Sequence, residues 1–491
     1  MSRTFLGHPR GLATLFFTEM WERFTYYGMR AMLVLFLVGA VATGGFGMDD
    51  RTATAIYGLY TAGVYLIALP GGWIADRLIG ARSAVLFGGL IITAGNAGLA
   101  LSQSPVAFYT SLVVIVVGVG LLKPNVSAMV AQLYPEGGAR RDSGFTIFYI
   151  GINVGAALGP LVTGEAQALF GARAGFAAAA LFMGVGVLQF HLTRRYLGTA
   201  GLAPAPSRVP GERRRSWLRV AAASAVLAVL VLACAIGWIR IDAVNLANYT
   251  FVLIVSIAVL FFGYFLFFAG LDAEERRRGT VRVVLFLGSA LFWTGYEQAG
   301  SSLNLFAERY TDRVSTALHF VIPTEWFQSL NAIFIVVFAP AFAWTWIALA
   351  RRRLDPSVPA KFAIGVMLMG SGFLVMAVAA TIVASGSKVL PWWLIFTYLL
   401  HTFGELCLSP VGLSFFTKLS PQRFVGQMMG MFFLSISLGN LAAGIVAGEF
   451  DAEHVAAMPG QYLHIVYFAL GLGGLLLLAS RSVKRLMGNA T

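Results

Sequence analysis

The chain has 491 residues, of which 58% are hydrophobic and only 12% are charged, and 35 Lys and Arg against 22 Asp and Glu give a formal net charge of +13. Soluble globular proteins carry about 25% charged residues, so this composition excludes a soluble domain and indicates a protein that crosses a membrane many times. The positive charge does not indicate a nucleic acid partner, because the basic residues lie in short connections between apolar runs.

Apolar runs of about 20 residues, each long enough to cross a bilayer, are bounded by charged or Gly- and Pro-rich turns. They predict about fourteen membrane-spanning helices, near residues 12–42, 52–76, 83–103, 105–134, 143–170, 174–197, 217–239, 246–270, 281–307, 322–349, 360–385, 389–418, 424–448 and 462–480.

Charge alternates along the connections between these runs. Arg140 and Arg141 lie in one of the basic connections, whereas Asp49 and Asp50 lie in an acidic one. Cytoplasmic loops carry the excess of Lys and Arg. This alternation therefore predicts that both termini lie in the cytoplasm.

The first apolar run contains the charged stretch TEMWERFTYYGMR, residues 18–30. Glu19, Glu22, Arg23, Tyr26 and Arg30 follow at steps of three, one, three and four, so they share one face of a helix. Each charge in mid-bilayer costs about 2.5–3.5 kcal/mol, so the stripe must face protein or a watery cavity. It serves either to tie helices together or to handle a charged cargo and a proton.

The end of the second run, GGWIADRLIGAR (71–82), resembles the loop signature of the major facilitator superfamily. This resemblance implies an all-α fold of two six-helix bundles, with the substrate site between halves related by an axis along the membrane normal. The predicted organisation is an N-terminal bundle at 1–197, a flexible cytoplasmic linker at 198–216, an accessory helix pair at 217–270 and a C-terminal bundle at 271–491. The accessory pair has few charges, so we assign it to packing or assembly.

Six blocks in the chain resemble, in order, the motifs of the proton-dependent oligopeptide transporter family, bacterial type. They are EMWERFTYY (19–27), GVGLLKPNVSAMVAQLY (118–134), FTIFYIGINVGA (145–156), FWTGYEQAGSSLNLFAER (292–309), EWFQSLNAIFIVVFAP (325–340) and HTFGELCLSPVG (401–412). The resemblance implies a monomeric importer of di- and tripeptides in the bacterial inner membrane. The second-helix histidine of animal members is absent from IYGLYTAGVYL (56–66), so carboxylates must carry the proton.

Lys123, Glu297 and Glu405 are further ionisable residues inside apolar runs. A peptide is a zwitterion, so a chamber with cations on one half and an anion on the other would recognise both of its ends. We expect Arg30 and Lys123 to bind the carboxylate and Glu405 to bind the ammonium group. The resemblance adds two amides and three pocket tyrosines, although core packing alone also explains the tyrosines: Asn153, Asn331, Tyr26, Tyr27 and Tyr65.

For proton coupling we expect Glu297 and the Glu19 and Glu22 pair, with Arg23 beside them, to carry the proton. Protonation of Glu297 would release Arg30 for the peptide carboxylate. Protons are the only coupling ion expected, with no cofactor and no metal. The chain shows no H-E-x-x-H, G-x-S-x-G or Walker-type motif, so we do not expect an enzyme. A facilitator for nitrate, a drug or a sugar remains an alternative.

Overall fold

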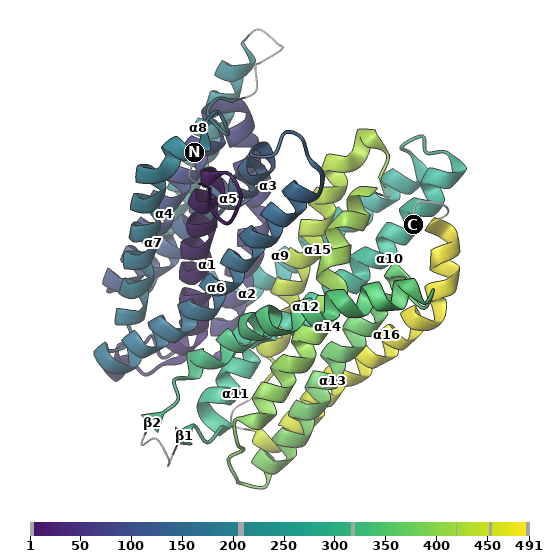
Figure 1. The fold of residues 1–491 in the computed structure, drawn as a ribbon. Coiled ribbons are helices and arrows are strands. Elements are labelled where there is room, and N and C mark those ends of the chain that lie inside the picture. The colour runs from purple at the N-terminus through teal and green to yellow at the C-terminus, as the bar shows by residue number, and fades with distance from the viewer. Residues whose placement is uncertain (1–3, 205–210, 316–319, 419, 451–453, 488–491) are drawn as a thin grey trace. The chain divides into compact units, whose positions relative to one another are not determined.

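The computed structural model describes residues 4–204, 211–315, 320–418, 420–450 and 454–487, and nearly all of them are helical (Figure 1). The exceptions to the predicted all-α fold are two short antiparallel strands, β1 (Val314–Ser315) and β2 (Phe320–Val321). The chain divides into two compact units. The first unit is Met1–Gly47 with Leu66–Asp242, and the second is Met48–Tyr65 with Ala243–Thr491.

The first unit contains the elements α1 (Arg10–Val38), η1 (Val41–Thr43), α3 (Ala68–Ile74), η2 (Ala75–Ile79), α4 (Ala81–Leu101), α5 (Pro105–Gln132), α6 (Gly138–Phe170), α7 (Ala174–Thr193), η3 (Arg194–Leu197) and α8 (Glu212–Ala235). Within it, α1 packs against α6 and α7, and α4 packs against α5 and α7. A Cβ atom added at Gly155 of α6 would lie 2.1 Å from the carbonyl oxygen of Met20. Only glycine permits this approach, which fixes the rotation of α1 about its own axis.

The second unit contains α2 (Asp50–Leu66), α9 (Ala243–Phe267), α10 (Ala273–Tyr296), η4 (Glu297–Gly300), α11 (Ser302–Tyr310), η5 (Thr324–Gln328), α12 (Ser329–Arg351), α13 (Val358–Ala384), α14 (Trp392–Lys418), η6 (Gln422–Phe424), α15 (Val425–Ala447), η7 (Val455–Ala457) and α16 (Met458–Met487). Here α13 packs against α14 and α16, and α10 packs against α15. Most of α2 belongs to this unit, although α3 directly after it belongs to the first.

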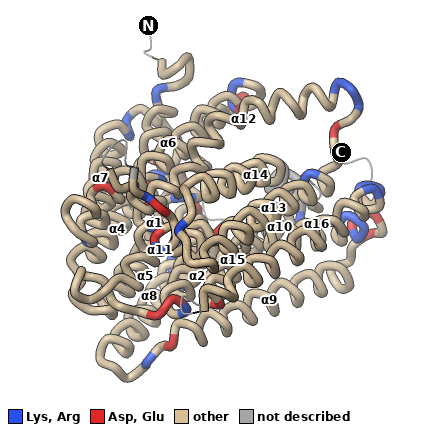
Figure 2. The backbone as a smooth tube through the Cα atoms, turned by 90° about the horizontal axis from the view of Figure 1, so that it is seen from below, with Lys and Arg blue, Asp and Glu red and all other residues tan. Residues whose placement is uncertain are grey.

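Eleven helical segments among the described residues are long and apolar enough to cross a membrane. The charged α1, the α10 to α11 segment and α14 are not among them, and with these three the number reaches the predicted fourteen. Charged residues gather at helix ends and connections, with long uncharged stretches between them (Figure 2). The fold is therefore that of a polytopic membrane protein.

The connection after η3 is held against the predicted signature loop. The Arg82 guanidinium donates to the carbonyl oxygens of Gly198 at 2.8 Å and Ala200 at 2.9 Å, and its backbone N–H donates to Gly201 at 2.9 Å. The helix α8 begins at Glu212, and Glu212 forms an ion pair with Arg77. The predicted flexible linker, 198–216, is therefore anchored at its start and helical at its end; residues 205–210 lie outside the described part of the chain.

The accessory helices α8 and α9 belong to different units. In the first unit, Arg213 at the start of α8 donates to the Leu78 carbonyl at 3.2 Å. In the second unit, Phe262 of α9 packs edge-on against Phe286 of α10, and Phe265 packs against Phe424. Each helix is thus fixed to its own unit.

Candidate functional site

The predicted polar stripe of α1 is buried within the first unit. Glu19, Glu22 and Arg23 are each less than 5% exposed. The Nε of Arg23 lies 3.1 Å from Glu19 Oε1 and 2.5 Å from Glu22 Oε2. One guanidinium therefore serves two carboxylates, and the trio carries a net negative charge when both are ionised.

One turn further along α1, two tyrosines surround the second arginine. The Arg30 guanidinium lies 4.8 Å from the ring centre of Tyr27 and 5.7 Å from that of Tyr26. The Arg23 guanidinium lies 5.4 Å from the ring centre of Tyr26. Cation–π contacts of this kind stabilise a desolvated arginine by about 2 kcal/mol. The structure thus brings together the predicted residues Tyr26, Tyr27 and Arg30.

Lys123 and Asn153 reach this unit's site from two other helices. Lys123 is half-buried on α5, next to the internal Pro124, and interacts electrostatically with Glu19. Asn153 is buried on α6, where its Nδ2 donates to the Tyr149 carbonyl 2.9 Å away on the same helix.

In the second unit, the predicted ammonium site is a hydrogen-bonded group. Asn331 of α12 donates to Glu405 Oε2 at 2.9 Å and to Thr402 Oγ1 at 3.0 Å, both on α14. The Asn331 amide therefore fixes the orientation of the half-buried carboxylate. Tyr65, half-buried near the end of α2, also belongs to this unit.

Glu297 opens the 3₁₀ turn η4 between α10 and α11, and it is 2% exposed. The Tyr57 hydroxyl of α2 donates to its Oε2 at 3.4 Å. The sequence analysis did not select Tyr57. In sequence, a tyrosine within an apolar run is most simply interpreted as a core residue. Only the three-dimensional structure shows that the Tyr57 hydroxyl lies at the Glu297 carboxylate.

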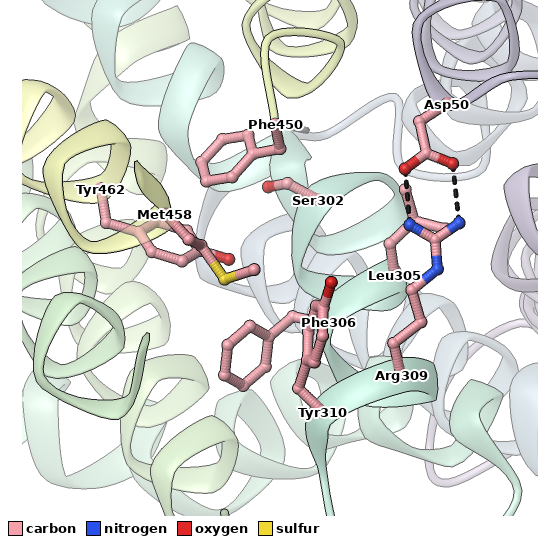
Figure 3. A pocket seen from close by; sticks show the side chains of 9 residues that line it. All are labelled: Asp50, Ser302, Leu305, Phe306, Arg309, Tyr310, Phe450, Met458 and Tyr462. Atoms are coloured by element: carbon pink, nitrogen blue, oxygen red, sulfur yellow. Dashed lines mark hydrogen bonds and ion pairs between the residues drawn. The ribbon is translucent and has the colours of Figure 1, made fainter. Parts of the chain in front are cut away.

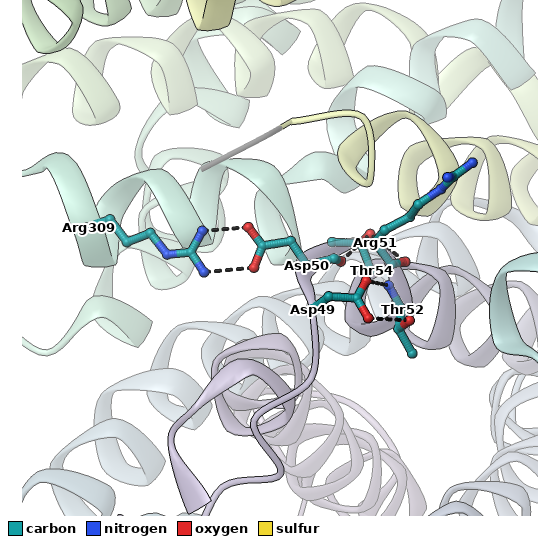
Figure 4. A network of polar contacts seen from close by, with 6 residues as sticks. All are labelled: Asp49, Asp50, Arg51, Thr52, Thr54 and Arg309. Carbon is teal, nitrogen blue, oxygen red and sulfur yellow. Dashed lines mark hydrogen bonds and ion pairs between the residues drawn. The ribbon is translucent and has the colours of Figure 1, made fainter. Parts of the chain in front are cut away.

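A second group that the sequence analysis missed lies at the start of α2 (Figure 4). Asp50 and Arg309 of α11 form a bidentate ion pair with distances of 2.5 and 2.7 Å. Asp49 caps α2 by accepting hydrogen bonds from the N–H and hydroxyl of Thr52 at 2.8 and 2.7 Å. Partial burial opposes ionisation of Asp49, but the bonds from Thr52 outweigh it and hold its pKa below the usual value.

A small cavity adjoins this ion pair (Figure 3). Its volume of about 20 Å³ has room for one water molecule. The rings of Phe306, Phe450 and Tyr462 line it beside Ser302. It is too small for a peptide and is therefore not the substrate site.

The described residues contain no group of three or more His, Cys, Asp or Glu that could hold a metal ion. The ionisable residues that the sequence analysis selected fall into two sets. The first unit holds Glu19, Glu22, Arg23, Arg30 and Lys123. The second holds Glu297 and Glu405. Such groups within membrane helices are typical of ion and substrate pathways.

Comparisons with known proteins identify the family. Residues 82–462 match the model of the POT family. The chain is 40% identical to the peptide transporter YePEPT of Yersinia enterocolitica, over 99% of this chain and 97% of the relative. It is 34% identical to a di-/tripeptide transporter of Lactococcus lactis subsp. cremoris, over 99% and 98% of the two chains. A crystal structure of a mutant peptide transporter POT in complex with alafosfalin shares 39% identity over 99% of this chain and 98% of that one, with a TM-score of 0.91. These relatives are transporters and not enzymes, and the chain belongs to the proton-dependent oligopeptide transporter (POT) family.

Proposed function

We propose that this transporter imports di- and tripeptides together with protons by alternating access. The observation that carries the proposal is the distribution of charge: one unit presents Arg30 and Lys123, and the other presents Glu405 with Asn331 already bonded to it. Opposite charges on the two halves match the two ends of a zwitterion. The names of the relatives, which include a di-/tripeptide transporter, support a peptide as the cargo.

The roles in this proposal are assigned from charge and from the family resemblance. Arg30 and Lys123 bind the peptide carboxylate, because a guanidinium forms a bidentate fork and an ammonium acts as a point charge. Glu405 binds the amino end. The remaining contacts, to the peptide backbone and side chains, come from Asn153, Asn331, Tyr26, Tyr27 and Tyr65.

Glu297 and the Glu19 and Glu22 pair carry the proton in this proposal. Protonation of Glu297 makes Arg30 available to the substrate carboxylate. Substrate and proton then bias the same equilibrium between two states, which is the requirement for coupling. The protein works as a monomer in the bacterial cytoplasmic membrane, with both termini in the cytoplasm. The inside-negative membrane potential assists import, because each positive charge that moves inward gains about 2.3 kcal/mol per 100 mV.

Uptake of a labelled dipeptide into proteoliposomes, with acid outside, tests the cargo. Unlabelled dipeptide should compete, whereas nitrate, a free amino acid and a sugar should not. Replacement of Glu405 by Ala should raise the KM about tenfold to a hundredfold, because a hydrogen bond to a charged group contributes about 1.5–3 kcal/mol. Glu449→Ala, at an exposed site, is the control. Competition by nitrate alone, or an unchanged KM in Glu405→Ala, would contradict the peptide assignment.

A further inference from the structure

We propose that Tyr57 is a positioning residue for proton binding, whose hydroxyl stabilises ionised Glu297 and so sets the pH at which protons drive uptake. The inference deepens the proposed function and rests on Glu297 being a proton site. It concerns a residue that lies outside the first-helix motif and outside the predicted substrate contacts.

The geometry around the Tyr57 hydroxyl fixes its position. Tyr57 is fully buried, and its hydroxyl lies 3.4 Å from Glu297 Oε2. A Cβ atom added at Gly300 would lie 2.2 Å from the same hydroxyl oxygen. The hydroxyl is therefore held against both ends of the turn η4, with the carboxylate at one end and a bare backbone at the other.

The packing of α2 keeps this tyrosine in register with η4. At the N-terminal end of the helix, Asp50 is bonded twice to Arg309. Next to Tyr57, Gly58 meets the backbone of Gly444 on α15, where an added Cβ would lie 3.1 Å from the Gly444 Cα. Toward the other end of α2, the Ser437 hydroxyl donates to the Ala62 carbonyl at 3.0 Å. Contacts on both sides of Tyr57 thus prevent the helix from sliding or turning.

The chemical effect depends on the charge of Glu297. A phenol hydroxyl that donates to a carboxylate forms a charge-assisted hydrogen bond, and most of that stabilisation is lost once the carboxyl group is protonated. The bond therefore favours the ionised form and opposes proton binding. Without the hydroxyl, Glu297 should bind a proton at a higher pH. Since the contact is long at 3.4 Å, we expect a shift of about half to one pH unit.

Other titratable groups near η4 are placed differently. Tyr398 of α14 donates to the Ala299 carbonyl at 3.3 Å, so its hydroxyl meets backbone rather than the carboxylate. The α15 sequence contains no titratable residue. On α2, Asp50 is paired with Arg309, and Tyr60 lies one turn beyond Tyr57. The helices that pack there carry further titratable groups: Arg51 and Tyr65 on α2, Tyr296, the residues 274–278 and Arg282 on α10, Glu308 and Tyr310 on α11, and His401, Glu405, Cys407 and Lys418 on α14.

The test compares Tyr57→Phe with Tyr398→Phe. Each variant removes one buried hydroxyl that donates to η4 and leaves the ring in place, but only Tyr57 meets the carboxylate. In proteoliposomes, the midpoint of the pH profile of proton-driven dipeptide uptake should move about half to one unit upward in Tyr57→Phe. Tyr398→Phe should keep the wild-type midpoint. Counterflow exchange at equal pH on both sides should persist in both variants.

If Tyr57→Phe fails to fold, a second variant still tests the inference. Gly300→Ala places a methyl group where the Tyr57 hydroxyl now lies, so it should displace that hydroxyl and move the midpoint in the same direction. No shift in either variant, a downward shift, or equal shifts in Tyr57→Phe and Tyr398→Phe would overturn the inference.

Glu297→Gln, measured alongside, separates this inference from the proposed function. Proton-driven uptake that persists in Glu297→Gln would remove Glu297 as the proton site and with it the proposed coupling. Uncoupled transport in Glu297→Gln with an unchanged midpoint in Tyr57→Phe would overturn only the role of Tyr57.

Discussion

Arg23 has two buried carboxylates for one guanidinium, and this imbalance characterises the α1 stripe. A purely structural tie needs one anion for each cation. The second carboxylate costs free energy in an apolar setting unless a proton, Lys123 or a substrate compensates it. The surplus charge on Glu19 and Glu22 therefore favours a transport role for the stripe over a role in helix packing alone.

Replacement of Glu297 by Gln should abolish proton-driven uptake and preserve counterflow exchange. Gln keeps the size and hydrogen-bonding capacity of the protonated acid but cannot release a proton. Uptake under an imposed pH gradient and exchange at uniform pH are the two measurements. If both remain at the wild-type level in Glu297→Gln, the proton assignment is wrong.

The site residues differ in how far the sequence could predict them. The i, i+3 and i, i+4 spacing placed Glu19, Glu22 and Arg23 on one face, and in the structure Arg23 contacts both carboxylates. Glu405 could be selected because it is a charged residue in an apolar run. Its hydrogen bond to Asn331 could not be predicted, because the two residues lie 74 positions apart and no sequence pattern links them. Tyr57 was missed because a buried hydroxyl and a packed ring look alike in sequence.

At the scale of elements, α2 has a polar start and an apolar body. Its first turn is stabilised by the Asp49 cap and tied to α11 through Asp50 and Arg309 (Figure 4). The bidentate pair has the geometry in which arginine and carboxylate interact most strongly. The start of α2 is therefore fixed within the second unit.

Asp49→Ala should lower stability by about 1 kcal/mol, because the cap of α2 is lost. Since the folded pKa of Asp49 is lowered, the ionised cap stabilises the fold above the unfolded pKa of about 3.9 and loses this effect as the pH falls through the lower folded value. Thermal unfolding of the detergent-solubilised protein should show a difference from wild type at pH 5–7 that shrinks below pH 4.

Asp49→Asn is the matched control, because Asn caps helices about as well as Asp without an ionisable group. It should stay close to the wild type at pH 7. A deficit in Asp49→Ala that is as large at pH 3 as at pH 7 would show that the ionised carboxylate is not the stabilising form.

At the scale of the whole molecule, the apolar runs of about 20 residues predicted the number of spans, and the structure supplies helices for all of them. The predicted bundles, 1–197 and 271–491, were divided by the order of the segments along the chain. That order does not reveal in which unit a given segment packs. The contacts of Gly58 with Gly444 and of Asp50 with Arg309 place residues 48–65 in the second unit, and these tertiary contacts leave no local sequence pattern.

The predicted topology can be tested by cysteine labelling in intact cells, with Cys234 and Cys407 replaced. Both termini in the cytoplasm put the turn between α8 and α9 outside and the start of α10 inside. Trp238→Cys, at an 84% exposed position, should react with a membrane-impermeant maleimide. Arg277→Cys should react only after the cells are permeabilised. The reverse pattern would invert the orientation.

The polypeptide passes from one unit to the other at three places, after Gly47, after Tyr65 and after Asp242. The stretch 48–65 is covalently the second span of the N-terminal half, yet its packing partners in α11 and α15 are made hundreds of residues later in synthesis. When the N-terminal half has left the ribosome, the segment 48–65 therefore still lacks its final packing partners. The packing of residues 48–65 is complete only once α15 has been synthesised.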